Sequence, residues 1–221
     1  MLKIISSKFI LLFVSSFLLA DNFEAPDLSL VENGDIVFHQ SKSSQSKAIA
    51  LATHSPLTHM GIVFIKKNKK FVYEAVGPVK LTPLSKWYER GQGKKLLILR
   101  AKESEELFSG DNLEKVFTQG LKFNKLPYDI YFEWSDQKIY CSELVWKMFK
   151  KAFNVELAPL EKLSDFDLSS EVVQKLMKKR YGENIPYNEK VISPVAIAHS
   201  SELEIVFSNF PENEFSRESS E

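Results

Sequence analysis

The stretch THMGIVFIKKNKKFVYEAV, residues 58–76, carries the strongest structural signal in the chain. Two runs rich in β-branched and aromatic residues, 58–65 and 70–76, are separated by the basic segment 66–69. Asn68 in that segment readily adopts the left-handed backbone conformation of a tight turn. The pattern therefore predicts an antiparallel β-hairpin.

The register of this hairpin decides which side chains meet. If Ile65 pairs with Lys70, Gly61 lies opposite Glu74, and His59 becomes a diagonal neighbour of Glu74 on the same face. Gly61 has no side chain, which leaves room for the carboxylate to reach the imidazole. A register shifted by one residue would separate the two side chains.

Predicted strands and helices follow one another on both sides of the hairpin. Further strands are expected at residues 31–38, 95–100 and 203–207, and helices at residues 43–53, 111–124, 140–149 and 168–181. Asp111 and Glu114 have the spacing of a capping box at the start of one of these helices. The expected fold is α+β, with one domain over residues 23–207 and a polar, disordered tail over residues 208–221.

The composition bounds the class of protein. A chain of 221 residues with 44% hydrophobic content can bury a sizeable core. Lys and Arg number 29 and Asp and Glu number 29, so the basic excess of a nucleic-acid-binding protein is absent. We therefore expect no nucleic-acid partner.

The first 20 residues have the pattern of a secretory signal peptide. Lys3 and Lys8 precede an apolar run that is too short to span a bilayer, and the small residue Ala20 ends it. Cleavage near Ala20 predicts a secreted or periplasmic protein. A retained membrane anchor and a buried first helix are the alternatives.

Cys141 is the one cysteine of the chain, so an internal disulfide is excluded. The choices are a buried inert thiol, a bridge between two chains and a reactive nucleophile. Apolar residues recur at helical spacing from Cys141 to Phe149, which puts the cysteine at a helix start. The positive potential there favours the thiolate, so we interpret Cys141 as a nucleophile.

A cysteine nucleophile needs a base and a group that orients the base. Among the four histidines, His59 can meet an acidic partner, Glu74, through the hairpin register. The alternative for both residues is an ordinary structural role. A metal site that combines His54 and His59 with His39 or His199 fits poorly, because the spacing is not that of a helical pair and no second cysteine is present.

Aromatic residues precede the cysteine in unusual number. Tyr140 and Trp134 are candidate substrate-binding residues, although core packing is the more common use of such side chains. His54, in a loop five residues before His59, is a further candidate for the rim of a cleft.

With these motifs the chain resembles the circularly permuted papain-like amidases, the YiiX-type branch of the NlpC-like cysteine peptidases. The resemblance is carried by motifs that occur in order along most of the chain, namely GDIVF at 34–38, HSPLTHMGIVF at 54–64, YEAV at 73–76, YDIYFEW at 128–134 and YCSELVW at 140–146, with a weaker match at VISP, 191–194. In this family the histidine and its acidic partner precede the cysteine, as they do here.

The resemblance implies a papain-like fold, in which a small antiparallel sheet packs against helices. It also implies Cys141 as nucleophile, His59 as base and Glu74 as orienting residue, with amide, peptide or acyl-lipid substrates near a membrane or cell wall and no cofactor. A lipid- or peptide-binding module without turnover and an acyltransferase are the competing interpretations. The sequence does not identify the substrate.

Overall fold

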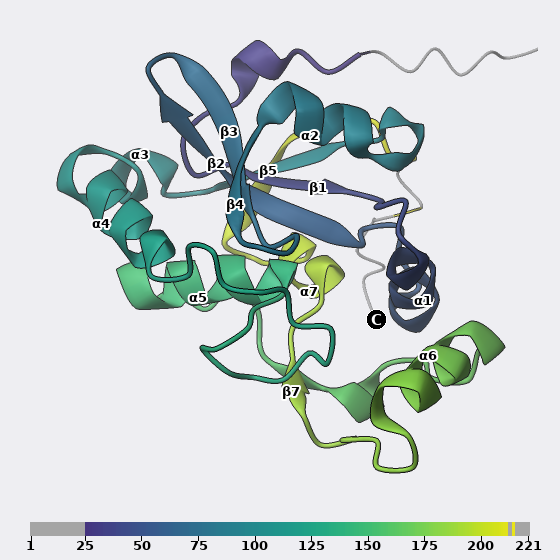
Figure 1. Cartoon of the computed structure of the whole chain (residues 1–221). Coiled ribbons are helices and arrows are strands. Elements are labelled where there is room, and N and C mark those ends of the chain that lie inside the picture. Colours follow the sequence, from purple (N-terminus) through teal and green to yellow (C-terminus); the bar gives the residue numbers. More distant parts are fainter. Residues whose placement is uncertain (1–24, 212–213, 215–221) are drawn as a thin grey trace, which may run out of the picture.

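Six antiparallel strands form the central sheet (Figure 1). The structure, a computed structural model, describes residues 25–211 and 214. The strands lie side by side in the order β4-β3-β2-β1-β5-β8. Their bounds are β1 Ile36–His39, β2 His59–Lys66, β3 Lys69–Glu74, β4 Lys80–Pro83, β5 Leu97–Ala101 and β8 Leu203–Ser208, and a separate pair consists of β6 Glu161–Lys162 and β7 Lys190–Val191.

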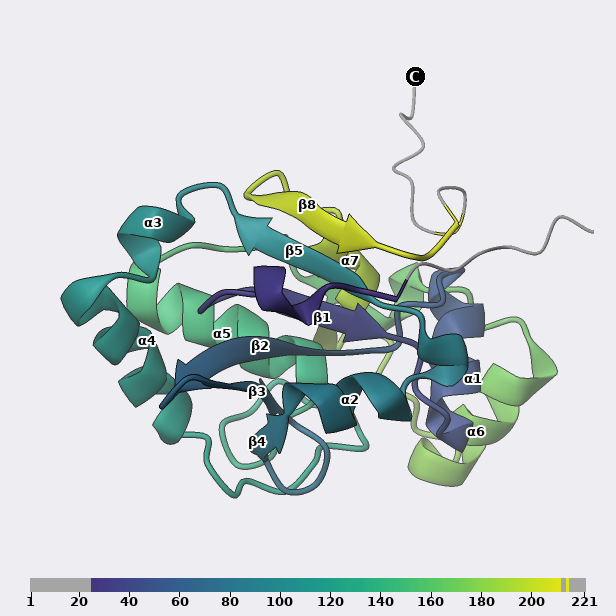
Figure 2. The same ribbon diagram turned by 90° about the horizontal axis from the view of Figure 1, so that it is seen from above.

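Helices cover both faces of the sheet. Figure 1 shows α2 on one face and α4, α5 and α7 on the other, while α1 and α6 lie against each other beyond one end. The same layers are visible from above in Figure 2, with β4 and β8 at opposite edges of the sheet. The helices are α1 Ser44–Thr53, α2 Leu84–Arg90, α3 Ser104–Leu107, α4 Gly110–Leu121, α5 Cys141–Phe153, α6 Glu171–Tyr181 and α7 Pro194–Ala198, with 3-10 turns at Leu28–Leu30, Gln92–Lys94 and Leu163–Asp165. The α+β class and the sheet packed against helices are confirmed.

The hairpin has the predicted register. Ile65 pairs with Lys70, and Lys67 and Asn68 both have positive φ angles, 50° and 57°, as a two-residue turn requires. A Cβ built on Gly61 would lie 2.8 Å from the Tyr73 carbonyl oxygen, so this position has no room for any side chain. The close approach of the two strands therefore depends on glycine.

Two apolar layers enclose the sheet because successive strand residues face opposite ways. Ile36 and Phe38 of β1 pack toward α5, whereas Val37 between them packs toward Trp87 of α2. Helix α5 presents a long buried face to the larger layer, including Leu144, which has no exposed surface. This packing holds the first residue of α5 at the end of strands β1 and β2.

The structure corrects several boundaries. Strand β1 is shorter than predicted, because Asn33 and Gly34 form a turn before it. The N-cap of α4 is Ser109, so Asp111 and Glu114 do not form the expected capping box. The strand predicted at 95–100 is confirmed as β5, which joins the sheet of the hairpin beside β1.

The predicted disordered tail does not begin at residue 208. Ser208 is the last residue of β8, and Phe210 is buried. Residues 212–213 and 215–221 lie outside the described part of the chain, as does the predicted signal peptide. Within the described residues, no helix has the length and apolar character needed to cross a membrane.

Replacing a buried leucine of α5 tests this packing. We expect Leu144→Ala to lower the free energy of unfolding by about 2–5 kcal/mol, because it leaves a cavity in the core. Leu121 at the end of α4 is 47% exposed, so Leu121→Ala is the matched control, with an expected loss below about 1 kcal/mol. Urea unfolding measures the free energy of unfolding of both variants, and equal losses in the two would contradict the packing described.

Candidate active site

Cys141 is the first residue of α5 and is 3% exposed. The backbone N–H groups of Met60 and Ser142 donate hydrogen bonds to its sulfur. Unpaired N–H groups at a helix start also give a positive potential that stabilises an anion. The sequence placed the cysteine at a helix start, and the structure confirms that position.

His59 is the first residue of β2 and lies between Cys141 and Glu74. Its Nε2 is 2.6 Å from Oε2 of Glu74, and its side chain is hydrogen-bonded to Cys141. Because Nε2 faces the carboxylate, Nδ1 is the ring nitrogen left for the thiol. The structure thus brings together the three residues that the sequence singled out.

The electrostatics favour an ion pair between the cysteine and the histidine. Burial alone would lower the pKa of His59, but its bonds to Cys141 and Glu74 outweigh burial and raise that pKa to about 9. Burial alone would raise the pKa of Cys141, but the hydrogen bond and charge of His59 outweigh it, so this pKa falls below its ordinary value. Thiolate and imidazolium therefore coexist from the lowered pKa of Cys141 up to about pH 9.

Glu74 is fully buried and accepts hydrogen bonds from three residues besides His59. The donors are the Thr82 hydroxyl at 2.6 Å, the Trp87 indole N–H at 3.0 Å and the Arg90 guanidinium at 2.5 Å. Burial opposes ionisation, but the bonds to His59, Arg90 and Thr82 outweigh it and lower the pKa of Glu74 to about 2. The carboxylate is therefore charged and held in one orientation.

These partners of Glu74 were not predicted from the sequence, because β4 and α2 were not expected. Leu84, Trp87 and Tyr88 recur three to four residues apart, which is the signal that indicates the short helix. Trp87 and Arg90 are three residues apart on α2 and so lie on one face of it. That face meets the end of the hairpin where Glu74 lies.

His39 is a second buried histidine beside the site. It pairs with His59 across β1 and β2, and its ring stacks on Trp87 with 3.9 Å between centroids. Burial and the charge of His59 hold the pKa of His39 well below its ordinary value, so this ring is neutral. His39 therefore packs against the indole of Trp87, which in turn orients Glu74.

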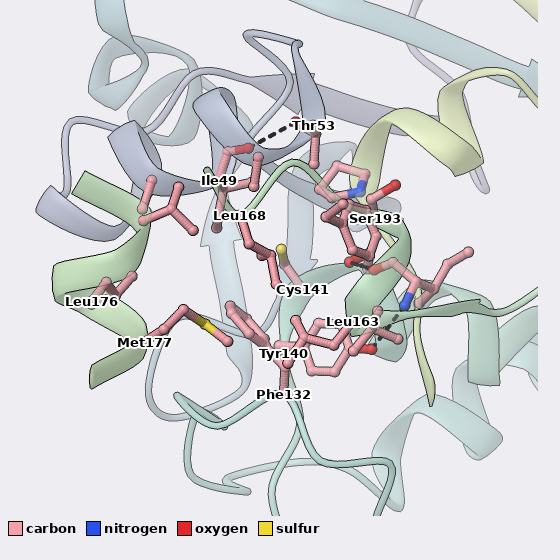
Figure 3. A pocket seen from close by; sticks show the side chains of 18 of the residues that line it. Ile49, Thr53, Phe132, Tyr140, Cys141, Leu163, Leu168, Leu176, Met177 and Ser193 are labelled. Carbon is pink, nitrogen blue, oxygen red and sulfur yellow. Dashed lines mark hydrogen bonds between the residues drawn. The ribbon is translucent and has the colours of Figure 1, made fainter. Parts of the chain in front are cut away.

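An apolar pocket opens at Cys141. Figure 3 shows the cysteine side chain pointing into it, with Ile49 and Thr53 of α1 on one side and Leu176 and Met177 of α6 on another. The cavity has a volume of about 100 Å³. Its other lining residues come mainly from three segments, Tyr128 and Phe132 before α5, Leu163, Phe166 and Leu168 before α6, and Val191, Ile192, Ser193 and Pro194 around β7.

The three predicted substrate-binding residues lie in different places. Tyr140 lines the pocket, and its hydroxyl accepts a hydrogen bond from the N–H of Ile192. Trp134 does not line it, because its ring packs edge-on against Trp146 with Lys147 above it. His54 is exposed at the end of α1 and pairs with Asp167. The structure thus brings Tyr140 to Cys141, but not Trp134 or His54.

The described part of the chain contains no group of three or more His, Cys, Asp or Glu side chains placed to hold a metal ion. The arrangement of Cys141, His59 and Glu74 instead has the parts needed for attack on a carbonyl carbon: a thiolate, a proton carrier and an orienting carboxylate.

Comparison with known proteins identifies the family of this chain. Residues 30–207 match the family described as "Permuted papain-like amidase enzyme, YaeF/YiiX, C92 family". The chain belongs to this family. YiiX of Escherichia coli (strain K12) is 43% identical over 180 residues, which is 81% of this chain and 88% of that protein.

A solved structure of the family has the same fold. The crystal structure of a protein described as "metalloprotein yiiX", from Escherichia coli O157:H7, is 42% identical, with a TM-score of 0.77 over 81% of this chain and 98% of that one. The predicted resemblance to the circularly permuted papain-like amidases is confirmed.

The ion pair has a measurable pH signature. We expect iodoacetamide to alkylate Cys141 with a midpoint below the ordinary cysteine pKa of about 8.5, because the thiolate is already present at lower pH. His59→Ala should move the midpoint to about 8.5 or above, since burial then acts on the thiol without a partner. His54→Ala, the control, should leave it unchanged. A pH–rate profile for His59→Ala identical to that of the wild type would contradict the pairing.

Proposed function

We propose that this protein is a cysteine hydrolase that cleaves amide or acyl substrates through a covalent acyl-enzyme, with Cys141 as nucleophile, His59 as base and Glu74 as orienting residue. Membership of the papain-like amidase family supports a hydrolase. The single observation that carries the residue roles is the position of His59, which is bonded to Cys141 on one side and to Glu74 on the other.

The chemistry follows from that arrangement. The Cys141 thiolate attacks the carbonyl carbon, and a C–S bond forms while the carbonyl electrons move to oxygen. The His59 imidazolium then gives its proton to the leaving nitrogen or oxygen as that bond breaks. Water attacks the thioester, His59 takes the proton from the water, and the C–S bond breaks to release the acid.

The oxyanion needs hydrogen-bond donors beside the sulfur. The backbone N–H of Cys141, at the helix start, is one candidate. Tyr128 is a second, because its hydroxyl accepts a hydrogen bond from Gln45 at 3.0 Å and so keeps its own proton for donation. Tyr128 and Cys141 both line the pocket, and the charge of Cys141 acts on the Tyr128 hydroxyl.

The pocket supports a substrate with an apolar acyl group. Its walls at α1 and α6 carry aliphatic side chains, among them Ile49, Leu176 and Met177 (Figure 3). Burying each methylene of an acyl chain there is worth about 0.8 kcal/mol. A fatty-acyl amide, an acylated peptide and a lipid ester all offer such a group.

The related protein from Escherichia coli O157:H7 is called a metalloprotein. Among the described residues of this chain, the side chains best suited to bind a metal ion are already hydrogen-bonded to one another. His59 uses Nε2 for Glu74, and both oxygens of Glu74 accept hydrogen bonds. These residues do not fit a metal centre in this arrangement, and the proposed reaction has no step through one.

We also propose that the protein acts outside the cytoplasm. The support is the signal-peptide pattern of residues 1–20, which lie outside the described part of the chain. Substrates at a membrane or in the cell wall would be reached there.

Mass spectrometry tests the acyl-enzyme directly. We expect incubation with N-octanoyl-p-nitroanilide to release p-nitroaniline and to leave an octanoyl adduct on Cys141. Cys141→Ala should show neither. His59→Ala should lose about 10²–10⁴-fold in kcat/KM, because proton transfer is lost. Tight binding of the octanoyl compound by the wild type with no adduct and no release, across amides and esters alike, would indicate a binding module instead.

Chain-length preference tests the pocket. The octanoyl anilide should exceed the acetyl anilide in kcat/KM by at least about tenfold. Ala52→Leu, which adds three carbons to a residue that lines the pocket, should reduce the octanoyl rate more than the acetyl rate. Ala50→Leu is the same change on the same helix, outside the lining, and serves as control. No difference between the two variants would contradict the assignment of the acyl group to this pocket.

A further inference from the structure

Arg180, near the end of α6, lines the apolar pocket into which Cys141 points. Among the described residues that line this cavity, Arg180 alone has a basic side chain. Two hydroxyls of the pocket are committed within the protein: those of Thr53 and Ser142 donate to backbone carbonyl oxygens at 2.9 and 2.7 Å. A charged side chain in such an apolar pocket requires a physical explanation.

The contacts of Arg180 leave most of its donors unused. The guanidinium donates to the side-chain oxygen of Gln45 and lies over the ring of Phe132, 5.2 Å from its centroid. A guanidinium has five N–H donors in a planar fork that fits a carboxylate in two bonds. Within residues 25–211 and at 214, Arg180 forms no ion pair, whereas Arg90 and Arg100 both do.

The carboxylate that acts on Arg180 through its charge is committed elsewhere. The charge of Asp129 acts on Arg180, but both oxygens of its carboxylate accept hydrogen bonds from the backbone N–H groups of Tyr131 and Glu133, at 2.8 and 2.7 Å. Burial is the largest influence on Arg180 and lowers its pKa, which is the effect expected of a cation without a close counterion.

Arg180 is also connected to the reactive cysteine. It donates to Gln45, Gln45 donates to the hydroxyl of Tyr128, and the charge of Cys141 acts on Tyr128. The cation and the thiol thus line the same pocket. A substrate that reaches from Cys141 into this cavity can therefore contact the guanidinium.

We propose that Arg180 binds a carboxylate of the substrate, so that the substrate class is an acyl compound with an apolar chain and a free carboxylate. A carboxylate matches the single positive charge of the pocket, whereas a phosphate dianion needs more than one cation or several N–H donors. This inference rests on the proposed function, because it assumes that the substrate acylates Cys141 from within this pocket.

Alkylation with charged and neutral reagents tests the assignment without requiring turnover. The probes are 6-(iodoacetamido)hexanoate and its terminal carboxamide, which share one reacting carbon and differ at the far end of an apolar chain. Saturation kinetics on the wild type separate the binding constant KI from the maximal alkylation rate. We expect the acid to bind about tenfold more tightly than the amide, because a charge-assisted bond to Arg180 is made only by the acid.

Three variants isolate the guanidinium. Arg180→Gln should abolish the preference for the acid in KI, and Arg180→Lys should retain part of that preference. Lys179→Gln removes the same charge from an exposed neighbour on α6 and should behave like the wild type. Circular dichroism verifies that each variant is folded.

The outcomes separate this inference from the proposed function. An acid preference that survives Arg180→Gln, or one that Lys179→Gln also removes, would overturn the role of Arg180 while rapid, His59-dependent alkylation by the carboxamide still supports the cysteine hydrolase. A phosphonate of the same length that binds more tightly than the acid would overturn the choice of a carboxylate. If neither probe alkylated Cys141, that result would count against the proposed function itself.

Discussion

The position of the His59 ring between a thiol and a carboxylate is the constraint on which the site depends. An imidazole in this place keeps its proton to a higher pH because both neighbours are negative, and each neighbour is held negative by the protein around it. Four donors surround Glu74, while a helix start and two backbone N–H groups face the sulfur of Cys141. The charge on each member therefore stabilises the charge on the next.

The fold supplies this arrangement from three separate elements. The tight hairpin brings Glu74 beside His59, and Gly61 permits the close approach of the two strands. Packing of α5 against one face of the sheet carries Cys141 to the strand ends, and α2 on the other face carries Trp87 and Arg90 to the carboxylate. The site therefore lies where both apolar layers meet the end of the sheet.

Local patterns in the sequence predicted part of this structure well. The register of residues 58–76 follows from turn chemistry and alternation within one hairpin, and the start of α5 follows from periodicity after Cys141. Features that depend on distant segments were not predicted. The pocket combines α1 with α6, and no local pattern shows that Ile49 and Met177 face one cavity. Trp134 was misplaced for the same reason, since an aromatic residue near the cysteine in sequence can pack outside the pocket, here against Trp146.

The most direct test of the central claim is the pKa of His59, measured by ¹⁵N NMR titration of the labelled histidine rings with His59→Ala as the assignment control. The ring of His59 should remain protonated through neutral pH and titrate near pH 9, because Cys141 and Glu74 both favour the cation. In Cys141→Ala the same ring should titrate at lower pH. A His59 ring that loses its proton below about pH 6.5 in the wild type, the ordinary value, would contradict the ion pair on which the proposed chemistry is built.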